Sequence, residues 1–245
     1  MKDFIFGIRA IIETIDSGKE IEKVLFKKGL QGELYQELFS LVRQRNIPFQ
    51  YVPIQKIDRI TKKNHQGVLA FISPVAYHDI EQVVPAIFEN GKLPLILVLD
   101  SVTDVRNFGA IARTAECAGI DTIVVPTKGG AMLNADAVKT SAGALNRIPI
   151  CRTNSLKKAV EFLQESGIQV VCASEKASED YFKVDFSAPT AIVMGGEEAG
   201  ISPDILRFAD KLVRIPMSGK TASLNVSVAS GIVIYEAVRQ RFNNK

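Results

Sequence analysis

The sequence has few of the residues that bind metals or form disulfides. Its three cysteines, Cys117, Cys151 and Cys172, form no C-x-x-C pair, and its only histidines are His65 and His78. A structural zinc site needs about four such ligands at close spacing, so we expect no metal. We expect the cysteines to be small buried side chains in a reducing compartment, and the histidines to be structural.

Long hydrophobic runs are absent as well. The run "LPLILVLD" is far shorter than the roughly 20 residues that span a bilayer, and the N-terminal "MKDFIFGIRAIIETID" is acidic and amphipathic rather than signal-like. With 47% apolar and 23% charged residues, the 245 residues can bury a real core in one or two globular domains. We therefore expect a soluble, cytoplasmic protein.

The chain also lacks a large net charge. Its net charge of +3 is only a weak indication of a polyanionic partner. Residues 1–75 carry 12 Lys and Arg against 8 Asp and Glu, whereas residues 76–245 carry 18 against 19. A solvated surface without any nucleic-acid partner explains this N-terminal excess equally well, so the charge leaves both interpretations open.

The pattern of apolar residues predicts two domains. Within residues 1–75, helices at 6–17 and 32–46 alternate with strands at 23–28, 48–53 and 67–74, which predicts a small β/α domain. Residues 76–92, with Pro85 and "ENGKLP", predict a partly helical linker. Residues 93–245 predict a larger domain in which apolar strands alternate with helix candidates at 108–118, 134–140, 155–166 and 224–241.

The strands of the larger domain are nearly continuous apolar runs, among them "LILVLD", "TIVVP", "VVCAS" and "AIVMGG". Such runs between helices favour an α/β fold with a parallel sheet covered on both faces. Ligands of these sheets bind at the carboxyl ends of the strands. The loops after Leu99, Met194 and Ile215 are therefore the candidate functional loops.

The first loop, "DSVTDVRNFGAIARTAECAG", combines helix caps with one charged residue in the helix. Asp104 and Asn107 are good caps, Gly109 allows another segment to come close, and Arg113 interrupts a series of small apolar residues. From spacing alone, the better-supported interpretation is that Asn107 only caps the helix and that Arg113 extends into solvent.

The second and third loops are rich in glycine and small polar residues. In "IVMGGEEAGIS", Gly195 and Gly196 would let the backbone approach a ligand, but Glu197 occupies the third position of a G-x-G-x-x-G pattern and excludes the dinucleotide motif. In "IPMSGKTASLNVSVASG", Ser223 or Asn225 can cap the last helix. One cap uses one polar residue, so the others need a ligand, a neighbouring loop or a second subunit.

Taken together, these loops resemble a known family. In order and spacing, "TDVRNFGAIARTAECAG", "VMGGEEAGI" and "IPMSGKTASLNVSVASGI" are similar to the three signature motifs of the SpoU (TrmH-like) RNA ribose 2′-O-methyltransferases of the SPOUT superfamily. The stretch "NHQGVLA" and the small basic N-terminal domain resemble the RlmB-type branch, which methylates a guanosine of 23S ribosomal RNA. The resemblance covers nearly the whole chain.

The resemblance implies a fold and a cofactor. The larger domain would contain a deep trefoil knot, which the rule against threaded connections would otherwise exclude. The second and third loops would bind S-adenosylmethionine largely through backbone groups. The residues implied for this pocket are Gly195, Gly196, Ile201, Ile215, Pro216 and Leu224.

The resemblance also implies catalytic residues, namely Asn107, Arg113, Glu197, Ser223 and Asn225. Arg113 matches an arginine described as activating the ribose hydroxyl. Because a guanidinium stays protonated in proteins, our hypothesis is that Arg113 clamps a substrate phosphate and polarises the hydroxyl, while Glu197 holds the guanidinium. Val105 is a departure, since many relatives have proline there, and we expect its effect to be modest.

Finally, the resemblance implies partners. The protein would be a homodimer, and basic residues of the N-terminal domain would contact RNA phosphates. These residues are Lys23, Lys27, Lys28, Arg43, Arg45, Lys62 and Lys63. Two other readings stay open, namely a transfer-RNA ribose 2′-O-methyltransferase and a non-catalytic ribosomal-RNA-binding assembly factor with the same fold.

Overall fold

The computed structural model describes residues 4–221 and 223–242, and the chain divides into two compact units. The first unit comprises Met1–Ala76 with Leu133–Ala135, and the second comprises Tyr77–Met132 with Asp136–Lys245. No helix of the described part is long and apolar enough to cross a membrane.

The first unit is a four-stranded sheet with helices on both faces. The strand order is β1-β4-β2-β3, in which β3 lies parallel to β2 and the other neighbours are antiparallel. Helices α1 and α2 bury Ile11, Leu38 and Val42 against one face, and α3 packs Ile57 against the other. The elements are β1 (Phe4–Phe6), α1 (Ile8–Asp16), β2 (Ile21–Lys27), α2 (Glu33–Gln44), β3 (Phe49–Val52), α3 (Ile54–Asp58) and β4 (Val68–Ile72).

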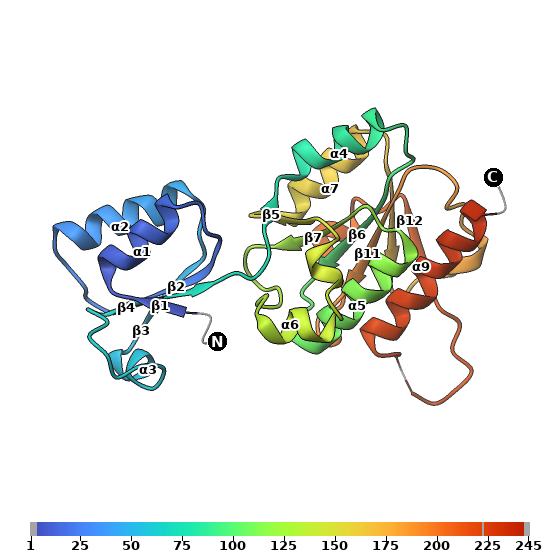
Figure 1. The fold of residues 1–245 in the computed structure, drawn as a ribbon. Coiled ribbons are helices and arrows are strands. Elements are labelled where there is room, and N and C mark those ends of the chain that lie inside the picture. Colours follow the sequence, from blue (N-terminus) through green and yellow to red (C-terminus); the bar gives the residue numbers. More distant parts are fainter. Residues whose placement is uncertain (1–3, 222, 243–245) are drawn as a thin grey trace. The chain divides into compact units, whose positions relative to one another are not determined.

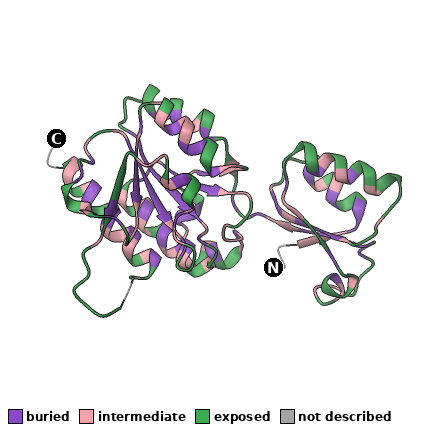
Figure 2. Ribbon diagram, turned by 180° about the vertical axis from the view of Figure 1, so that it is seen from behind, coloured by how far each residue is buried: buried purple, intermediate pink, exposed green. Residues whose placement is uncertain are grey.

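The second unit is a parallel α/β domain, as the apolar strands predicted. Its eight strands have the order β10-β12-β9-β11-β6-β7-β8-β5, and every neighbouring pair is parallel. The strands are β5 (Tyr77–His78), β6 (Leu95–Asp100), β7 (Thr122–Pro126), β8 (Ile150–Thr153), β9 (Gln169–Ala173), β10 (Glu179–Asp180), β11 (Thr190–Gly195) and β12 (Lys211–Arg214). Figure 2 shows that the central strands are buried while the outer surfaces of the helices are exposed.

Helices cover both faces of this sheet (Figure 1). One face packs against α4, α7 and α8, and the other carries α5 and α9, which pack against each other. The helices are α4 (Ile80–Glu89), α5 (Val105–Ala118), α6 (Ala135–Thr140), α7 (Leu156–Glu165), α8 (Pro203–Leu206) and α9 (Val226–Phe242), with short 3₁₀ turns η1 (Ala144–Asn146) and η2 (Tyr181–Lys183).

The segment 76–92, for which we predicted a partly helical linker, is structured as part of the second unit. Strand β5 pairs with β8, and α4 buries Ile80 and Val84 in the core beside α7. The apolar positions of α4 recur at helical spacing, which was the available signal. Pro85 lies inside α4 and does not end it.

The order of the strands in the sheet determines where the three candidate loops lie. Strands β6 and β11 are neighbours, and their register pairs Gly195 with Asp100, so both strands end at the same level of the sheet. The first and second loops therefore start side by side. The third loop leaves β12, two strands away from β11, and returns to α9, which packs on the helix of the first loop.

Candidate functional site

Three side chains from the three loops form one hydrogen-bonded group. Asn107 Nδ2 donates to Glu197 Oε1 at 3.0 Å, and Asn225 Nδ2 donates to the same oxygen at 2.6 Å and to Asn107 Oδ1 at 3.0 Å. These residues lie 90 and 28 positions from Glu197 in sequence. The structure therefore unites three of the five predicted catalytic residues.

The start of α5 frees the Asn107 side chain for this group. Asp104, not Asn107, is the N-cap, and its Oδ1 accepts from the backbone N–H groups of Arg106 and Asn107, both at 2.8 Å. The simpler interpretation, in which Asn107 only caps the helix, is therefore wrong. Val105 is the first helical residue, a position that proline would also suit.

Asn225 both starts α9 and joins the loops. Its Oδ1 accepts from Ser227 N at 3.0 Å and from the Ser227 hydroxyl, while its Nδ2 serves the group described above. The Ser230 hydroxyl is buried and donates to Val226 O at 2.7 Å. Gly231 lies opposite Thr114 of α5, where an added Cβ would be 3.8 Å from the threonine methyl. The small residues of α9 thus allow the helix to pack closely, and the Asn225 carboxamide belongs to the candidate site.

Gly195 and Gly196 are required by the protein's own backbone. A Cβ on Gly195 would lie 2.2 Å from Gly200 C and 2.3 Å from Ile201 N, and one on Gly196 would lie 2.2 Å from Ser101 O. We expected these glycines to admit a ligand. Instead the chain folds back on them, with a bridge between Gly196 and Gly200.

Asp100, at the end of β6, is a site residue that the sequence reasoning missed. Its buried carboxylate accepts from Ser202 N at 2.7 Å and from the Ser101 hydroxyl at 3.0 Å, so it ties the second loop to the first. Ser101 has a left-handed φ of 59°, which turns the chain sharply after the strand. The available signal was a carboxylate at the end of a buried strand.

Arg113 does not join the group. It is exposed on α5, six residues beyond Asn107 and hence about 120° around the helix, and no hydrogen bond or ion pair involves its side chain within the described residues. The hypothesis that Glu197 holds its guanidinium is therefore wrong in this chain, because Glu197 accepts from the two amides. Ser223 is also exposed, with no partner among the described residues.

The predicted cofactor residues surround the same loops. Ile201 is buried, Ile215 and Leu224 are half-buried, and Pro216 is exposed. The backbone N–H groups of Glu197, Glu198 and residues 217–221 have no hydrogen-bond partner within the described part of the chain. Free backbone donors beside apolar side chains are able to bind a ligand with both polar and apolar parts.

The seven predicted RNA-binding residues are spread over the first unit. Lys28, Arg43, Arg45, Lys62 and Lys63 are exposed, while Lys23 and Lys27 are half-buried on β2. None of their side chains has a hydrogen-bond or ion-pair partner in the described residues. They belong to β2, to the end of α2 and to the segments that follow β2, α2 and α3.

His65 is structural, as expected: its Nε2 contacts Asp58 Oδ1 at 3.0 Å and its Nδ1 accepts from Gly67 N at 3.0 Å. Cys151 and Cys172 are buried, but Cys117 is exposed, contrary to expectation. Burial raises the pKa of the Cys172 thiol to about 12. Among the described residues no group of three His, Cys, Asp or Glu could hold a metal.

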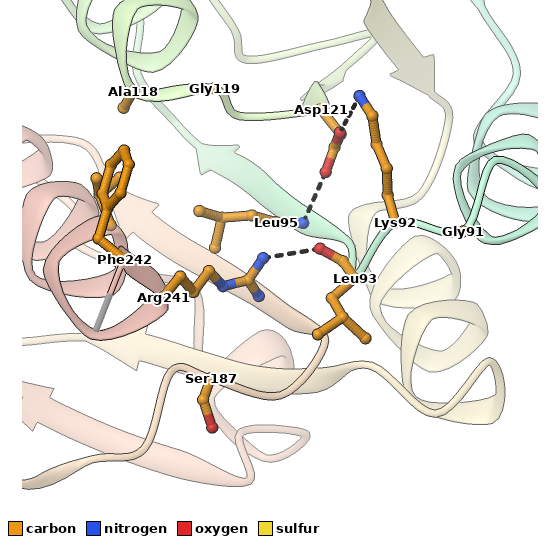
Figure 3. Close-up of a pocket in the computed structure, with 11 residues that line it drawn as sticks. Gly91, Lys92, Leu93, Leu95, Ala118, Gly119, Asp121, Ser187, Arg241 and Phe242 are labelled. Atoms are coloured by element: carbon orange, nitrogen blue, oxygen red, sulfur yellow. Dashed lines mark hydrogen bonds and ion pairs between the residues drawn. The ribbon is translucent and has the colours of Figure 1, made fainter. Parts of the chain in front are cut away.

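A pocket of about 580 Å³ lies at the other end of the strands, near the start of β6 (Figure 3). Lys92 pairs with Asp121 there at 3.3 Å, and Asp121 accepts from Leu95 N at 2.9 Å. Arg241 donates to four backbone carbonyls around the pocket, at 2.7 to 2.9 Å. These groups are already paired, and of the three loop sequences only Ala118 and Gly119, at the far end of α5, line the pocket.

Comparisons with known proteins agree with this geometry. Residues 94–235 match the SpoU rRNA Methylase family, and residues 4–78 match the family described as RNA 2′-O ribose methyltransferase substrate binding. The chain is 34% identical to YacO of Bacillus subtilis, a protein assigned to the TrmH family of tRNA/rRNA methyltransferases, over 98% of this chain and 96% of YacO.

Solved structures are similar in fold. The SpoU methyltransferase AviRb from Streptomyces viridochromogenes, in complex with AdoMet, has a TM-score of 0.63 and 26% identity, covering 98% of this chain and 90% of AviRb. An AdoMet-bound rRNA methyltransferase from Sinorhizobium meliloti has a TM-score of 0.60 and 27% identity, covering 96% of this chain and 86% of that protein.

Proposed function

Because the chain belongs to the SpoU rRNA methylase family, we propose that it transfers a methyl group from S-adenosylmethionine to a ribose 2′-hydroxyl of RNA, most specifically to a guanosine of 23S ribosomal RNA. The observation that carries this proposal is the hydrogen-bonded group of Asn107, Glu197 and Asn225. Three polar side chains from loops far apart in sequence converge at the strand ends where such sheets bind ligands.

The residues present fit the cofactor. The free backbone N–H groups of the second and third loops would bind its polar ends, and Ile201, Ile215 and Leu224 would contact its adenine. S-adenosylmethionine supplies the electrophilic methyl group when it is bound. The two glutamates of the second loop, Glu197 and Glu198, favour a cationic ligand over a phosphate.

The chain's own groups must then align the ribose hydroxyl. Glu197 anchors both amides and so fixes the first and third loops relative to each other. Arg113 is exposed and has no partner in the described residues, so its guanidinium is available to a phosphate of the RNA. In this proposal Arg113 clamps that phosphate and polarises the hydroxyl, and Ser223 contacts the substrate side.

The Arg113 role is testable by substitution. Arg113→Lys keeps the positive charge but loses the two-pronged donor, so we expect turnover to fall at least 10-fold while S-adenosylmethionine binding stays unchanged. Calorimetry measures the binding and labelled methyl transfer measures the turnover. Turnover close to that of the unmodified protein would contradict the clamp.

We propose a homodimer that uses one side of α9. Val228, Tyr235 and Phe242 are 52%, 50% and 68% exposed, and they recur every seven residues, so they form an apolar stripe along one side of the helix. A second copy would bury this stripe about a two-fold axis. Val228→Glu with Tyr235→Lys should then produce monomers in analytical ultracentrifugation. The trefoil knot formed by the second and third loops stays a prediction.

The decisive experiment supplies methyl-labelled S-adenosylmethionine and unmodified bacterial total RNA. We expect label at one guanosine 2′-O position of large-subunit ribosomal RNA, and none with Asn107→Ala. Label in transfer RNA would keep the chemistry and overturn the ribosomal substrate. No label, with precursor ribosomal particles also tested, would overturn the enzymatic proposal in favour of a binding protein.

A further inference from the structure

The first unit carries a cluster of five aromatic rings beside an open edge of its sheet. Phe26, Tyr35, Phe39, Phe49 and Tyr51 form seven ring contacts with centroid distances between 5.3 and 6.1 Å. Phe26 on β2 is fully buried at the centre. The rest come from α2 and from β3, which is an edge strand. The cluster therefore begins in the core and reaches the surface at this edge.

Two tyrosines form the outer end of the cluster. Tyr51 is 41% exposed and Tyr35 is half-buried, and their hydroxyl groups are hydrogen-bonded at 2.8 Å. Burial and this hydrogen bond raise the pKa of Tyr35 to about 12, so the Tyr35 ring stays neutral at any physiological pH. The other rings of the cluster and the hydrogen bond between the two hydroxyl groups therefore hold both tyrosine rings in place, while Tyr51 is exposed to solvent.

The charge around the cluster is positive. Tyr35, Phe39 and Arg43 follow each other at intervals of four residues, so they share one flank of α2, and Arg43 is exposed. The acidic residues of this helix, Glu33 and Glu37, are each two residues from Tyr35 and lie about 160° round the helix from it. At the other end, Lys28 is exposed, and its backbone N–H donates to Val52 O, next to Tyr51. Cations therefore stand at both ends of the aromatic row.

The following inference rests on the proposed function. We propose that Tyr51, supported by Tyr35, stacks an unpaired base of the substrate RNA, while Arg43 and Lys28 contact the phosphates on either side of that base. Stacking on an exposed aromatic ring is how proteins bind single-stranded RNA, and flanking cations complete such sites. A β-strand from a partner protein could also add to the β3 edge, but it has no need of cations at both ends of the row.

Binding measurements separate the aromatic from the electrostatic contribution. For an unmodified 23S ribosomal RNA transcript we expect Tyr51→Leu to weaken binding about 5- to 100-fold and to leave the slope of log K against log salt unchanged. Tyr51→Phe, which keeps the ring, should bind like the unmodified protein. Arg43→Ala should instead reduce the steepness of the salt slope by about one unit.

A fluorescent reporter tests the contact directly, because the chain contains no tryptophan. Tyr51→Trp would place a single indole in the platform, and we expect a single-stranded RNA oligonucleotide to quench it more strongly than the same sequence in a duplex. Phe182→Trp is the matched control, since Phe182 is 49% exposed in the second unit, and its emission should not change.

The outcomes are distinct for the two proposals. Tyr51→Leu with unchanged RNA affinity, or Tyr51→Trp with no quenching while methyl transfer proceeds, overturns the stacking platform and leaves the methyltransferase intact. Failure of the unmodified protein to transfer methyl groups overturns the proposed function instead. If single-stranded RNA still quenches Tyr51→Trp in that case, the platform stands as a site for unpaired RNA in a binding protein.

Discussion

The substitution Gly195→Ala probes how closely the second loop folds onto the end of β11. The added Cβ would lie 2.2 Å from Gly200 C, 2.3 Å from Ile201 N and 2.6 Å from Gly200 O, and all three are backbone atoms. Ordinary contacts begin at 3.4 Å, so the returning backbone must retreat by more than 1 Å. Gly195 has no positive φ, so the effect is steric rather than conformational.

The loss of stability follows from the contacts that this backbone movement breaks. Overpacking costs about 1–3 kcal/mol. The loop bond from Gly200 N to Gly196 O, at 2.9 Å, adds about 1 kcal/mol if it is lost. We therefore expect a loss of about 3 kcal/mol in the free energy of unfolding, or a melting temperature lower by about 6–12 °C for a domain of this size. The displaced backbone should also weaken S-adenosylmethionine binding at least 10-fold.

Differential scanning calorimetry measures the first effect and titration calorimetry the second. Gly231→Ala is the matched control, because its added Cβ would meet only the Thr114 methyl at an ordinary 3.8 Å and its φ is not positive. A Gly195→Ala protein that melts within 1 °C of the unmodified chain and binds S-adenosylmethionine equally well would refute the reasoning.

Three further predictions concern the site and the last helix. Asn225→Ala removes two donated hydrogen bonds and the cap of α9. Methyl transfer should therefore fall at least 100-fold, and the free energy of unfolding should fall by about 1–2 kcal/mol. A rate of methyl transfer near that of the unmodified protein would contradict the role of Asn225. Arg241→Ala removes a donor from four carbonyls, of which Pro94 O and Ala188 O still accept from Thr190, so urea unfolding should show a loss of about 3 kcal/mol in stability. A loss below about 0.5 kcal/mol would contradict this role of Arg241. The hydrogen bonds from Arg239 lower the pKa of Glu236 in the folded chain below its value in the unfolded chain. The ionised carboxylate therefore stabilises the folded chain fully above about pH 4.3, and this stabilisation is lost as the pH falls through the pKa of the folded state. The stability difference between the unmodified chain and Glu236→Gln should therefore be largest at neutral pH and disappear in acid, and a difference independent of pH would exclude the pair as its cause.

The sequence by itself determined the class of fold and the three loops from which the candidate site is built. Uninterrupted apolar strands such as Leu95–Asp100 bury both faces, which requires a parallel sheet covered by helices, and that pattern is local enough to read. The three polar loops were identified because each follows a predicted strand, although β12, before the third loop, buries only Val213. The linker was misassigned because a two-residue strand, β5, has no periodicity to detect.

Only the tertiary structure decided which side chains meet. Strand order puts β11 beside β6, and the packing of α9 on α5 brings Asn225 to Asn107, so Glu197 accepts from two amides rather than from Arg113. Sequence spacing also could not reveal that Gly195 and Gly196 make room for the chain's own backbone. Periodicity follows from local geometry, whereas strand order and close contacts depend on how residues about 100 positions apart pack together.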